Sequence, residues 1–389
     1  MNVAYIINSV TNTSIPLEMA ALLSQRENVQ MTVLALYDSQ QKAEQAAAQA
    51  GFPAKCIGFD FKRKKFSALV SIKKELCSGK YDVVHTHHTF SGSVARFLGK
   101  NHAQLVHTVH TNYSAFSKMQ NIIIGSTLNL CDEVVFVSKF ARECLPAWEK
   151  RRIKKCRQAV IYNGVNIDRI RQADTAFADR FCEENGIGKD TFCFAQIGRL
   201  EKVKNIDATL IGFEQFLRQD QYKMDCRLIL AGDGKERENI IKRISESDVL
   251  RTHVIWAGMI KRDDVYSLFK RVDCMIVSSF YEGFCNALFE GIIGGVRLIV
   301  SDIPVFRELF GTMPCDKGFH WINPHQPASI AQAMRTVLNE KDWKNQVDER
   351  AAIVQRQFGS DNCLDEYIKV YRQIISEGKQ HAANHQRHI

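Results

Sequence analysis

Short runs of apolar and β-branched residues alternate with longer segments of helical period along most of the chain. In the first half, the runs that predict strands are 3–8, 30–36, 81–86, 104–108, 133–137 and 159–162. A second set follows at 192–197, 227–231, 253–256, 274–277 and 297–300. Continuous apolar strands separated by helices are typical of a parallel sheet whose two faces are both covered. The pattern therefore predicts an α/β protein with two such sheets.

A polar segment at 168–190 contains no strong strand and separates the two sets. We therefore expect two doubly wound, Rossmann-like domains at 1–170 and 171–360. A helix at 361–378 could cross back to the first domain, and 379–389 is expected to be a flexible tail. In two such domains that face each other, the carboxyl ends of both sheets border a central cleft where ligands bind.

The composition of the 389 residues is that of an ordinary globular protein, with 45% hydrophobic and 24% charged residues. Its 12 cysteines are scattered singly, without a C-x-x-C pair for zinc or redox chemistry. The sequence shows neither a secretory signal nor an apolar run of the roughly 18 residues that a membrane span needs. These features favour a reducing, cytoplasmic location.

Positive charge is concentrated in the first half, where residues 1–160 hold 21 Lys and Arg against 11 Asp and Glu. Two basic runs, Lys62–Lys65 and Lys150–Arg157, contribute much of this excess. They are either solvated faces or the contact with an anionic membrane surface, as expected of a peripheral protein on the inner face of the cytoplasmic membrane. The apolar anchors expected beside them are Phe61, Phe66, Trp148 and Ile153. Nucleic acid is not an expected partner, because no zinc finger, RNP or KH sequence accompanies the charge.

The segment from Gly198 to Asn205 follows a predicted strand and precedes a helix for which Asn205 is the natural N-cap. A glycine at a strand end allows close approach of a ligand to the backbone. Arg199 and Lys204 would place two cations beside a helix N-terminus, which itself favours anions. This arrangement suits a diphosphate, and an ordinary βα turn with solvated cations is the alternative.

A second segment, 278–290, again joins a strand to a helix. It places Glu282 in the loop and Glu290 inside the helix. Carboxylates accept hydrogen bonds from sugar hydroxyls, and the amides at a helix start bind anions. The combination indicates a ligand with phosphate and polyol parts, as in a nucleotide sugar.

Several motifs, in order, resemble family 4 retaining glycosyltransferases of the GT-B fold. In the second half they are Gly-Arg-Leu-x-x-x-Lys-Asn, Ala-Gly-Asp-Gly at 231–234, Glu-Gly-Phe-x-Asn-Ala-Leu-x-Glu at 282–290, and Val-Ser-Asp at 300–302. In the first half they are Asp-Val-Val-His-Thr-His at 82–87, Thr-Val-His at 108–110 and Tyr-Asn-Gly-Val-Asn at 162–166. The resemblance covers nearly the whole chain.

The resemblance implies transfer of a hexose-type sugar from a nucleotide sugar, UDP-linked rather than GDP-linked, to a glycan or lipid-linked glycan in surface polysaccharide or lipopolysaccharide synthesis. It implies retention at the anomeric carbon, without a metal or another cofactor. The catalytic residues would be His110, Arg199, Lys204 and Glu282. The donor would also contact Gly198, Met259, Ile260, Gly283, Phe284, Cys285, Asn286 and Glu290, and the acceptor would contact Glu18, His87 and Asn163.

Three departures from the family pattern bear on this interpretation. Ile15-Pro16-Leu17-Glu18 replaces a Gly-Gly loop near the acceptor, Cys285 replaces a common glycine, and 303–308 lacks a frequent glycine pair. A metal cluster at His85, His87 and His88, and a plain turn at Asn163-Gly164, are alternatives for those residues. For the whole chain, the alternatives are a nucleotide-sugar epimerase of similar fold and a non-catalytic glycan- or membrane-binding module.

Overall fold

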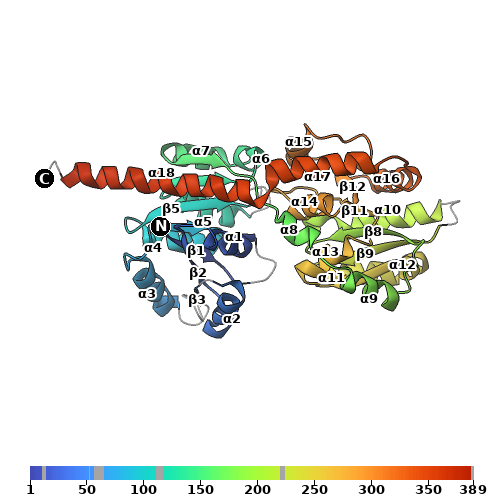
Figure 1. The fold of residues 1–389 in the computed structure, drawn as a ribbon, viewed down its shortest axis with the longest axis horizontal. Helices are drawn as coiled ribbons and strands as arrows, with labels where there is room; N and C mark the ends of the chain where they lie inside the picture. Colours follow the sequence, from blue (N-terminus) through green and yellow to red (C-terminus); the bar gives the residue numbers. More distant parts are fainter. Residues whose placement is uncertain (11–14, 52, 57–64, 111–116, 220–223, 387–389) are drawn as a thin grey trace. The chain divides into compact units, whose positions relative to one another are not determined.

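The protein is described from a computed structural model that covers residues 1–389 except 11–14, 52, 57–64, 111–116, 220–223 and 387–389. The chain forms two compact units, which Figure 1 shows as a ribbon. Unit 1 comprises Met1–Gly164 and Ser360–Ile389, and unit 2 comprises Val165–Gly359. The predicted α/β class with two Rossmann-like parallel sheets is confirmed.

Unit 1 is built on a parallel sheet of seven strands in the order β3-β2-β1-β4-β5-β6-β7. The strands are β1 Asn2–Ile7, β2 Gln30–Ala35, β3 Ala54–Cys56, β4 Val83–Thr86, β5 Gln104–Val109, β6 Glu133–Phe136 and β7 Arg157–Val160. The helices are α1 Ile15–Ser24, α2 Gln40–Ala50, α3 Lys65–Leu76, α4 Thr89–Gly99, α5 Lys118–Leu128, α6 Lys139–Glu143, α7 Ala147–Arg152 and α18 Ser360–Gln386, with the 3₁₀ turn η2 Ile153–Lys155.

Unit 2 repeats the plan with a six-stranded sheet in the order β10-β9-β8-β11-β12-β13. Its strands are β8 Phe192–Ile197, β9 Cys226–Ala231, β10 Val254–Gly258, β11 Cys274–Val277, β12 Arg297–Ser301 and β13 Phe319–Ile322. Its helices are α8 Ile167–Arg171, α9 Ala176–Glu184, α10 Ile206–Arg218, α11 Arg237–Ser245, α12 Asp248–His253, α13 Arg262–Leu268, α14 Asn286–Ile293, α15 Pro304–Phe310, α16 Pro327–Asn339 and α17 Lys344–Phe358, with the 3₁₀ turn η3 Lys202–Lys204.

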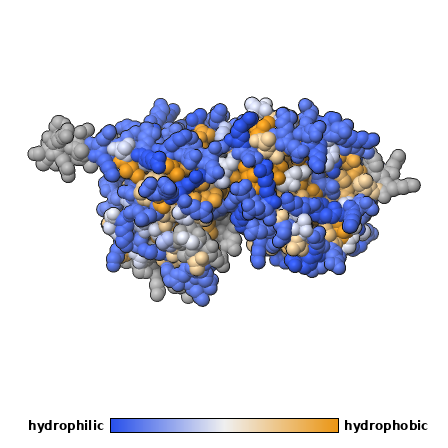
Figure 2. Space-filling model, in the orientation of Figure 1, coloured by the Kyte–Doolittle hydropathy of each residue, from blue (hydrophilic) through white to orange (hydrophobic). Residues whose placement is uncertain are grey.

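Both faces of the first sheet are covered by helices. Successive side chains of a strand point to opposite faces, so one strand contributes to two separate cores. In β1, Tyr5 packs in a core with α1 and α18, whereas Ile6 packs in another core with α3 and α4. On the face of the molecule in Figure 2, hydrophilic residues predominate and the hydrophobic ones form separate patches.

Two strands, β3 and β13, were not predicted from the sequence. Each lies at the edge of its sheet. The strand β3 has only three residues, and the central residues of β13, His320 and Trp321, are only partly buried. An edge strand with a half-buried pattern carries little of the apolar signal that identifies a central strand.

The unit boundaries fall at Gly164/Val165 and Gly359/Ser360, and not at the expected 170/171 and 360/361. Val165 forms a parallel bridge with Gly359, and its amide donates to the carbonyl of Phe358. The short helix α8 that follows therefore belongs to unit 2. The C-terminal helix α18 packs in unit 1, where Leu364, Tyr367, Ile368, Tyr371 and Ile374 are buried in the same core as β1.

Aspartates that precede strands inside the sheets join neighbouring strands at the amino-terminal edges of both sheets. In each case the carboxylate accepts a hydrogen bond from the first part of the neighbouring strand, which aligns the two strands. The pairs are Asp82 with the amide of Asn2 at 2.8 Å, Asp132 with Leu105 at 2.7 Å, and Asp273 with Cys193 at 2.8 Å. The aspartate of the Asp-Val-Val-His motif is therefore structural.

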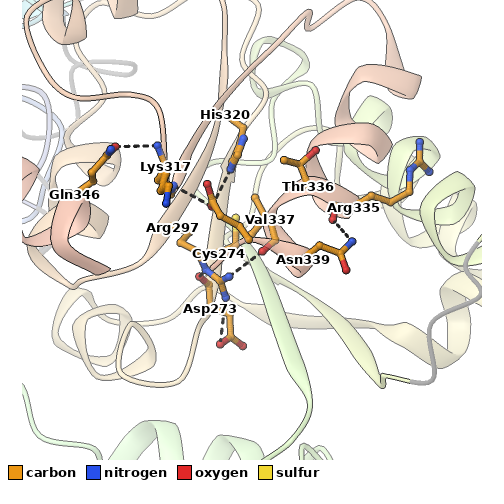
Figure 3. Close-up of polar contacts among 12 residues, drawn as sticks. Asp273, Cys274, Arg297, Lys317, His320, Arg335, Thr336, Val337, Asn339 and Gln346 are labelled. Atoms are coloured by element: carbon orange, nitrogen blue, oxygen red, sulfur yellow. Dashed lines mark hydrogen bonds and ion pairs between the residues drawn. The ribbon is translucent and has the colours of Figure 1, made fainter. Parts of the chain in front are cut away.

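Arg297 fastens the same edge of the unit 2 sheet (Figure 3). Its guanidinium donates to the carbonyls of Asp273 and Val337 and makes cation–π contacts with the rings of Phe192 and Trp343. Nearby, the Glu340 carboxylate contacts His320 at 3.1 Å and accepts from the Gly318 amide at 2.9 Å. These contacts anchor the C-terminal end of α16 to β12 and β13.

The turn Ala231-Gly232-Asp233-Gly234 packs directly on the loop after β8. A Cβ atom at Gly232 would lie 1.9 Å from the carbonyl oxygen of Gly198, and one at Gly234 would lie 2.4 Å from that of Leu200. The amide of Leu200 donates to the carbonyl of Asp233 at 3.0 Å. Both glycines are therefore required by close approach of two backbones.

We predict that Gly232→Ala lowers the free energy of unfolding by more than about 3 kcal/mol, because it combines a clash with backbone and an unfavourable φ. Gly258→Ala is the matched control: Gly258 also has positive φ, but a Cβ there would meet nothing within 4 Å. Gly258→Ala should lower the free energy of unfolding by only about 1 kcal/mol. Urea unfolding of both variants measures the difference, and equal losses would contradict the packing argument.

Candidate active site

A small pocket lies at the carboxyl ends of β8 and β11 in unit 2. Gly198, Arg199, Lys204, Ser279 and Cys285 contribute to its lining. The carboxyl end of adjacent parallel strands is where doubly wound sheets bind ligands. The two segments singled out in the sequence are therefore brought together at one place.

Lys204, which lines this pocket, forms a partly buried ion pair with Glu282. The Lys204 ammonium lies 2.6 Å from Oε1 of Glu282, which also accepts a 2.7 Å hydrogen bond from the Ser279 hydroxyl. Burial alone would lower the pKa of Lys204, but the Glu282 carboxylate outweighs it and the pKa is raised. The ammonium is therefore a permanent positive charge at the end of the sheet.

Hydrogen bonds join the two loops that carry this ion pair. The amide of Phe280 donates to the carbonyl of Val203 at 2.9 Å, and the Ser278 hydroxyl donates to the carbonyl of Lys204 at 3.1 Å. Asn205 occupies the residue before α10, as expected, but its side chain does not cap that helix. It is in the left-handed conformation and donates instead to the carbonyls of Ser278 and Pro324.

Arg199 differs from Lys204 in being largely exposed. Its side chain is 74% exposed and pairs with Glu201 at 2.8 Å. In a high-dielectric environment such a pair is weak. Arg199 can therefore exchange Glu201 for an anionic ligand at little cost, whereas Lys204 is held in place.

Glu290 lies deeper, on the first helix after the pocket loop. Its carboxylate is 2.8 Å from the Arg262 guanidinium and accepts from the Tyr266 hydroxyl at 3.2 Å. The side chains of Glu290 and Arg262 are about nine-tenths buried. Arg262 and Tyr266 were not predicted from the sequence, because nothing in the start of α13 indicates that Arg262 contacts a residue 28 positions further along the chain.

The remaining predicted donor residues lie in the loop before α14, at the start of that helix and at the end of β10. Phe284 is buried and stacks on Phe289 with ring centroids 4.6 Å apart, so its side chain serves the core. Gly283 and Asn286 flank it at the start of α14. At the end of β10, Met259 is 74% exposed and Ile260 is partly buried. An exposed apolar side chain at a strand end can lie against a flat ring.

Cys285 has the left-handed backbone that its place in the loop requires, with φ 77°. Burial raises the pKa of its thiol to about 12, so the side chain is a neutral thiol. The conformation explains why glycine is common there in the family: the turn into α14 needs a positive φ that glycine adopts without strain.

In unit 1, the predicted residues His87 and His110 contact each other at the carboxyl ends of β4 and β5. Nδ1 of His87 lies 3.0 Å from Nε2 of His110. Burial lowers the pKa of His87 well below its usual range and that of His110 to about 3, so both rings are neutral at physiological pH. His107 points to the other face of β5, where it contacts Thr86 and Arg96.

The other predicted acceptor residues lie elsewhere in unit 1. Glu18 is partly exposed in the first turn of α1. Asn163 is buried beside Gly164, where a Cβ atom would lie 2.8 Å from Cα of Ser360. The glycine of Asn163-Gly164 is therefore required by the close approach of α18.

The basic run Lys150–Arg157 covers α7, η2 and the start of β7. Lys150, Arg151, Lys154 and Lys155 are exposed, as is Trp148 at 40%. The expectation for Ile153 is wrong: it is 1% exposed and packs in the core. The run Lys62–Lys65, with Phe61 and Phe66, lies outside the residues whose side chains are described. No described helix has the length and apolar character needed to cross a bilayer.

Comparison with known proteins agrees with this geometry. A model for "Glycosyl transferases group 1" matches residues 178–354, and a model for "Glycosyltransferase Family 4" matches 17–169. A glycosyltransferase of Methanocaldococcus jannaschii is 24% identical over 75% of each chain. The Escherichia coli UDP-Gal:alpha-D-GlcNAc-diphosphoundecaprenol alpha-1,3-galactosyltransferase is 26% identical over 62% of each.

Among solved structures, Anabaena HepE in complex with UDP-glucose superimposes with a TM-score of 0.79. The match covers 96% of this chain and 100% of HepE, at 14% identity. Fold, motifs and family models together define a glycosyltransferase of GT-B architecture. The chain belongs to the family 4 glycosyltransferases.

We predict that Cys285→Gly keeps or raises the free energy of unfolding, because it removes left-handed strain of about 1–3 kcal/mol. Cys285→Val should lower the free energy of unfolding by at least about 2 kcal/mol, since a β-branched residue fits positive φ poorly. Cys274→Gly, at a buried thiol inside β11, is the control and should destabilise. Urea unfolding decides; a Cys285→Gly variant as unstable as Cys274→Gly would show that the position does not need a glycine-like backbone.

Proposed function

We propose that this glycosyltransferase moves a hexose from a UDP-sugar to a lipid-linked glycan in surface polysaccharide synthesis, with retention at the anomeric carbon. The observation that carries the proposal is the Lys204–Glu282 pair at the mouth of the β8 and β11 loops. The names of the relatives support the donor and acceptor classes: the Escherichia coli relative is named for UDP-galactose and a diphosphoundecaprenol-linked sugar.

Lys204 and Arg199 have complementary parts in the proposed donor site. The departing nucleoside diphosphate gains negative charge as the glycosidic bond breaks. A fixed ammonium stabilises that charge without reorganisation, and the exposed guanidinium of Arg199 adds a second cation once the donor arrives. The two cations supply the charge compensation that a divalent metal provides in other transferases.

The carboxylates of Glu282 and Glu290 would accept hydrogen bonds from hydroxyl groups of the nucleotide sugar. In the described part of the chain, both contacts of Glu282 use Oε1, which leaves Oε2 to accept from the transferred sugar. Glu290, held by Arg262 and Tyr266, would accept from the ribose. Met259 and Ile260 would lie against the base.

In unit 1, the neutral His110 would donate a hydrogen bond to the transferred sugar or accept one from it. A neutral imidazole does so without adding a charge that competes with the diphosphate. His87, in contact with His110, and Glu18 and Asn163 would face the acceptor. A front-face reaction, in which the leaving phosphate helps to deprotonate the acceptor hydroxyl, needs no protein nucleophile.

A transfer assay tests this proposal, using undecaprenyl-diphosphate-linked N-acetylglucosamine as acceptor and a panel of UDP- and GDP-hexoses in EDTA. We predict UDP release and an α-linked disaccharide. Lys204→Met should lower kcat at least about a hundredfold. Lys202→Met, an exposed cation in the same 3₁₀ turn, should change kcat less than about twofold.

Three outcomes would count against the proposal. A β-linked product would contradict retention, and activity with GDP-sugars alone would contradict the donor. An epimerised nucleotide sugar formed without acceptor would favour the epimerase.

We also propose that unit 1 binds an anionic membrane through α7 and its neighbours. The exposed cations Lys150 and Arg151 lie on α7, which packs on α5, and α5 packs on α4. These two helices expose Phe97 at 70%, Met119 at 72% and Ile122 at 60%. Apolar side chains beside cations are typical of a surface that binds anionic lipid.

Sedimentation with vesicles of phosphatidylglycerol and phosphatidylethanolamine tests this surface. Lys150→Glu/Arg151→Glu should weaken binding at least about tenfold, since each cation near the surface contributes roughly 1 kcal/mol. The control Lys235→Glu/Lys270→Glu reverses two exposed cations of unit 2 and should not weaken vesicle binding. Equal loss in both double variants would show that net charge, and not this surface, governs binding.

A further inference from the structure

The C-terminal helix α18 places two tyrosine hydroxyls in a buried hydrogen-bond network of unit 1. The hydroxyl of Tyr371 lies 3.0 Å from that of Tyr5 and 2.6 Å from Nδ1 of His85. Nε2 of His85 lies 2.8 Å from the Thr108 hydroxyl, which lies 3.0 Å from that of Tyr367. All five residues are buried. The network thus connects α18 to β1, β4 and β5.

Every member of this network is uncharged. Burial lowers the pKa of His85 well below its usual range and raises the pKa of the Tyr371 and Tyr367 hydroxyls. In a neutral imidazole, one nitrogen donates and the other accepts. A hydroxyl can take either role, so the hydroxyls of Tyr371 and Thr108 satisfy both nitrogens and fix the ring orientation of His85.

The two rings that Tyr371 contacts, Tyr5 and His85, both pack against the ring of His87. The centroid of the His87 ring lies 4.1 Å from that of His85 and 4.4 Å from that of Tyr5. His87 is 6% exposed, and its Nε2 makes no hydrogen bond in the described part of the chain. Its polar anchor there is the 3.0 Å contact of Nδ1 with His110. The ring of His87 thus contacts Tyr5 and His85 through its faces and edges, and His110 through Nδ1.

We propose that Tyr371 is a positioning residue for the reaction: its hydroxyl holds Tyr5 and His85 against His87, and His87 orients His110 toward the transferred sugar. This inference rests on the proposed function, because the role of His110 does. Packing alone does not require the hydroxyl, since phenylalanine would fill the same volume. Its removal leaves Tyr5 and His85 without the partner that they share.

A double-mutant cycle separates positioning from stability. Tyr371→Phe should lower kcat about tenfold and leave the donor KM within about twofold, because it loosens a group needed after binding. In a His110→Ala background, the same substitution should change kcat less than about twofold. A tenfold effect that persists without His110 would overturn the proposal.

The control is Tyr81→Phe. Tyr81 is also buried in unit 1, but in the core on the opposite face of the sheet, where its hydroxyl donates to Glu75 at 2.7 Å. It should lower the melting temperature about as much as Tyr371→Phe does and leave kcat unchanged. A loss of kcat in Tyr81→Phe equal to that in Tyr371→Phe would mean that any destabilised core lowers the rate, and would overturn the positioning role.

A second readout needs no activity. In substrate-free protein labelled with ¹⁵N-histidine, Tyr371→Phe should shift the ring-nitrogen signals of His87 and His110, and Tyr81→Phe should not. If Tyr371→Phe does not fold, Tyr367→Phe, at the other end of the network, should shift them instead. Unchanged signals would overturn the inference. Absence of glycosyl transfer in the wild type would instead overturn the proposed function and leave this result standing.

Discussion

The proposed donor site depends on the ion pair between Lys204 and Glu282. The pair joins the loop after β8 to the loop after β11, which are the two central strands of the unit 2 sheet. Both groups are mostly buried, so removing one would leave the other as an uncompensated charge. The same contact that fixes the two loops therefore also keeps a cation and a carboxylate oxygen at the pocket. One interaction therefore serves both the stability of the loops and the proposed chemistry.

Much of this arrangement could be predicted from the sequence. Central strands have continuous apolar runs, and ligands bind at the carboxyl ends of such strands, so Lys204, Glu282 and His110 could be assigned to strand ends. The glycines of Ala-Gly-Asp-Gly have a physical reason that the structure makes explicit, because they touch the backbone of the Gly198 loop. Two of the edge strands escaped prediction, because β3 has only three residues and the apolar run of β13 is interrupted by His320.

The contacts that hold the site residues could not be predicted in the same way. Arg262 pairs with Glu290 across 28 residues, and Tyr371 contacts His85 across 286. The apolar spacing of α18 predicted that this helix packs on something, but that spacing does not distinguish a tyrosine that fills a core from one whose hydroxyl holds a histidine. Supporting residues depend on tertiary neighbours, and a single sequence does not contain that information.

The most direct measurement is a crystal structure of the chain with UDP in the presence of EDTA. We predict the diphosphate at the loop that follows β8, with an oxygen within hydrogen-bond distance of the Lys204 ammonium, and the ribose hydroxyls at Glu290. UDP bound away from Lys204, or bound only when a divalent cation is restored between the diphosphate and the protein, would contradict it.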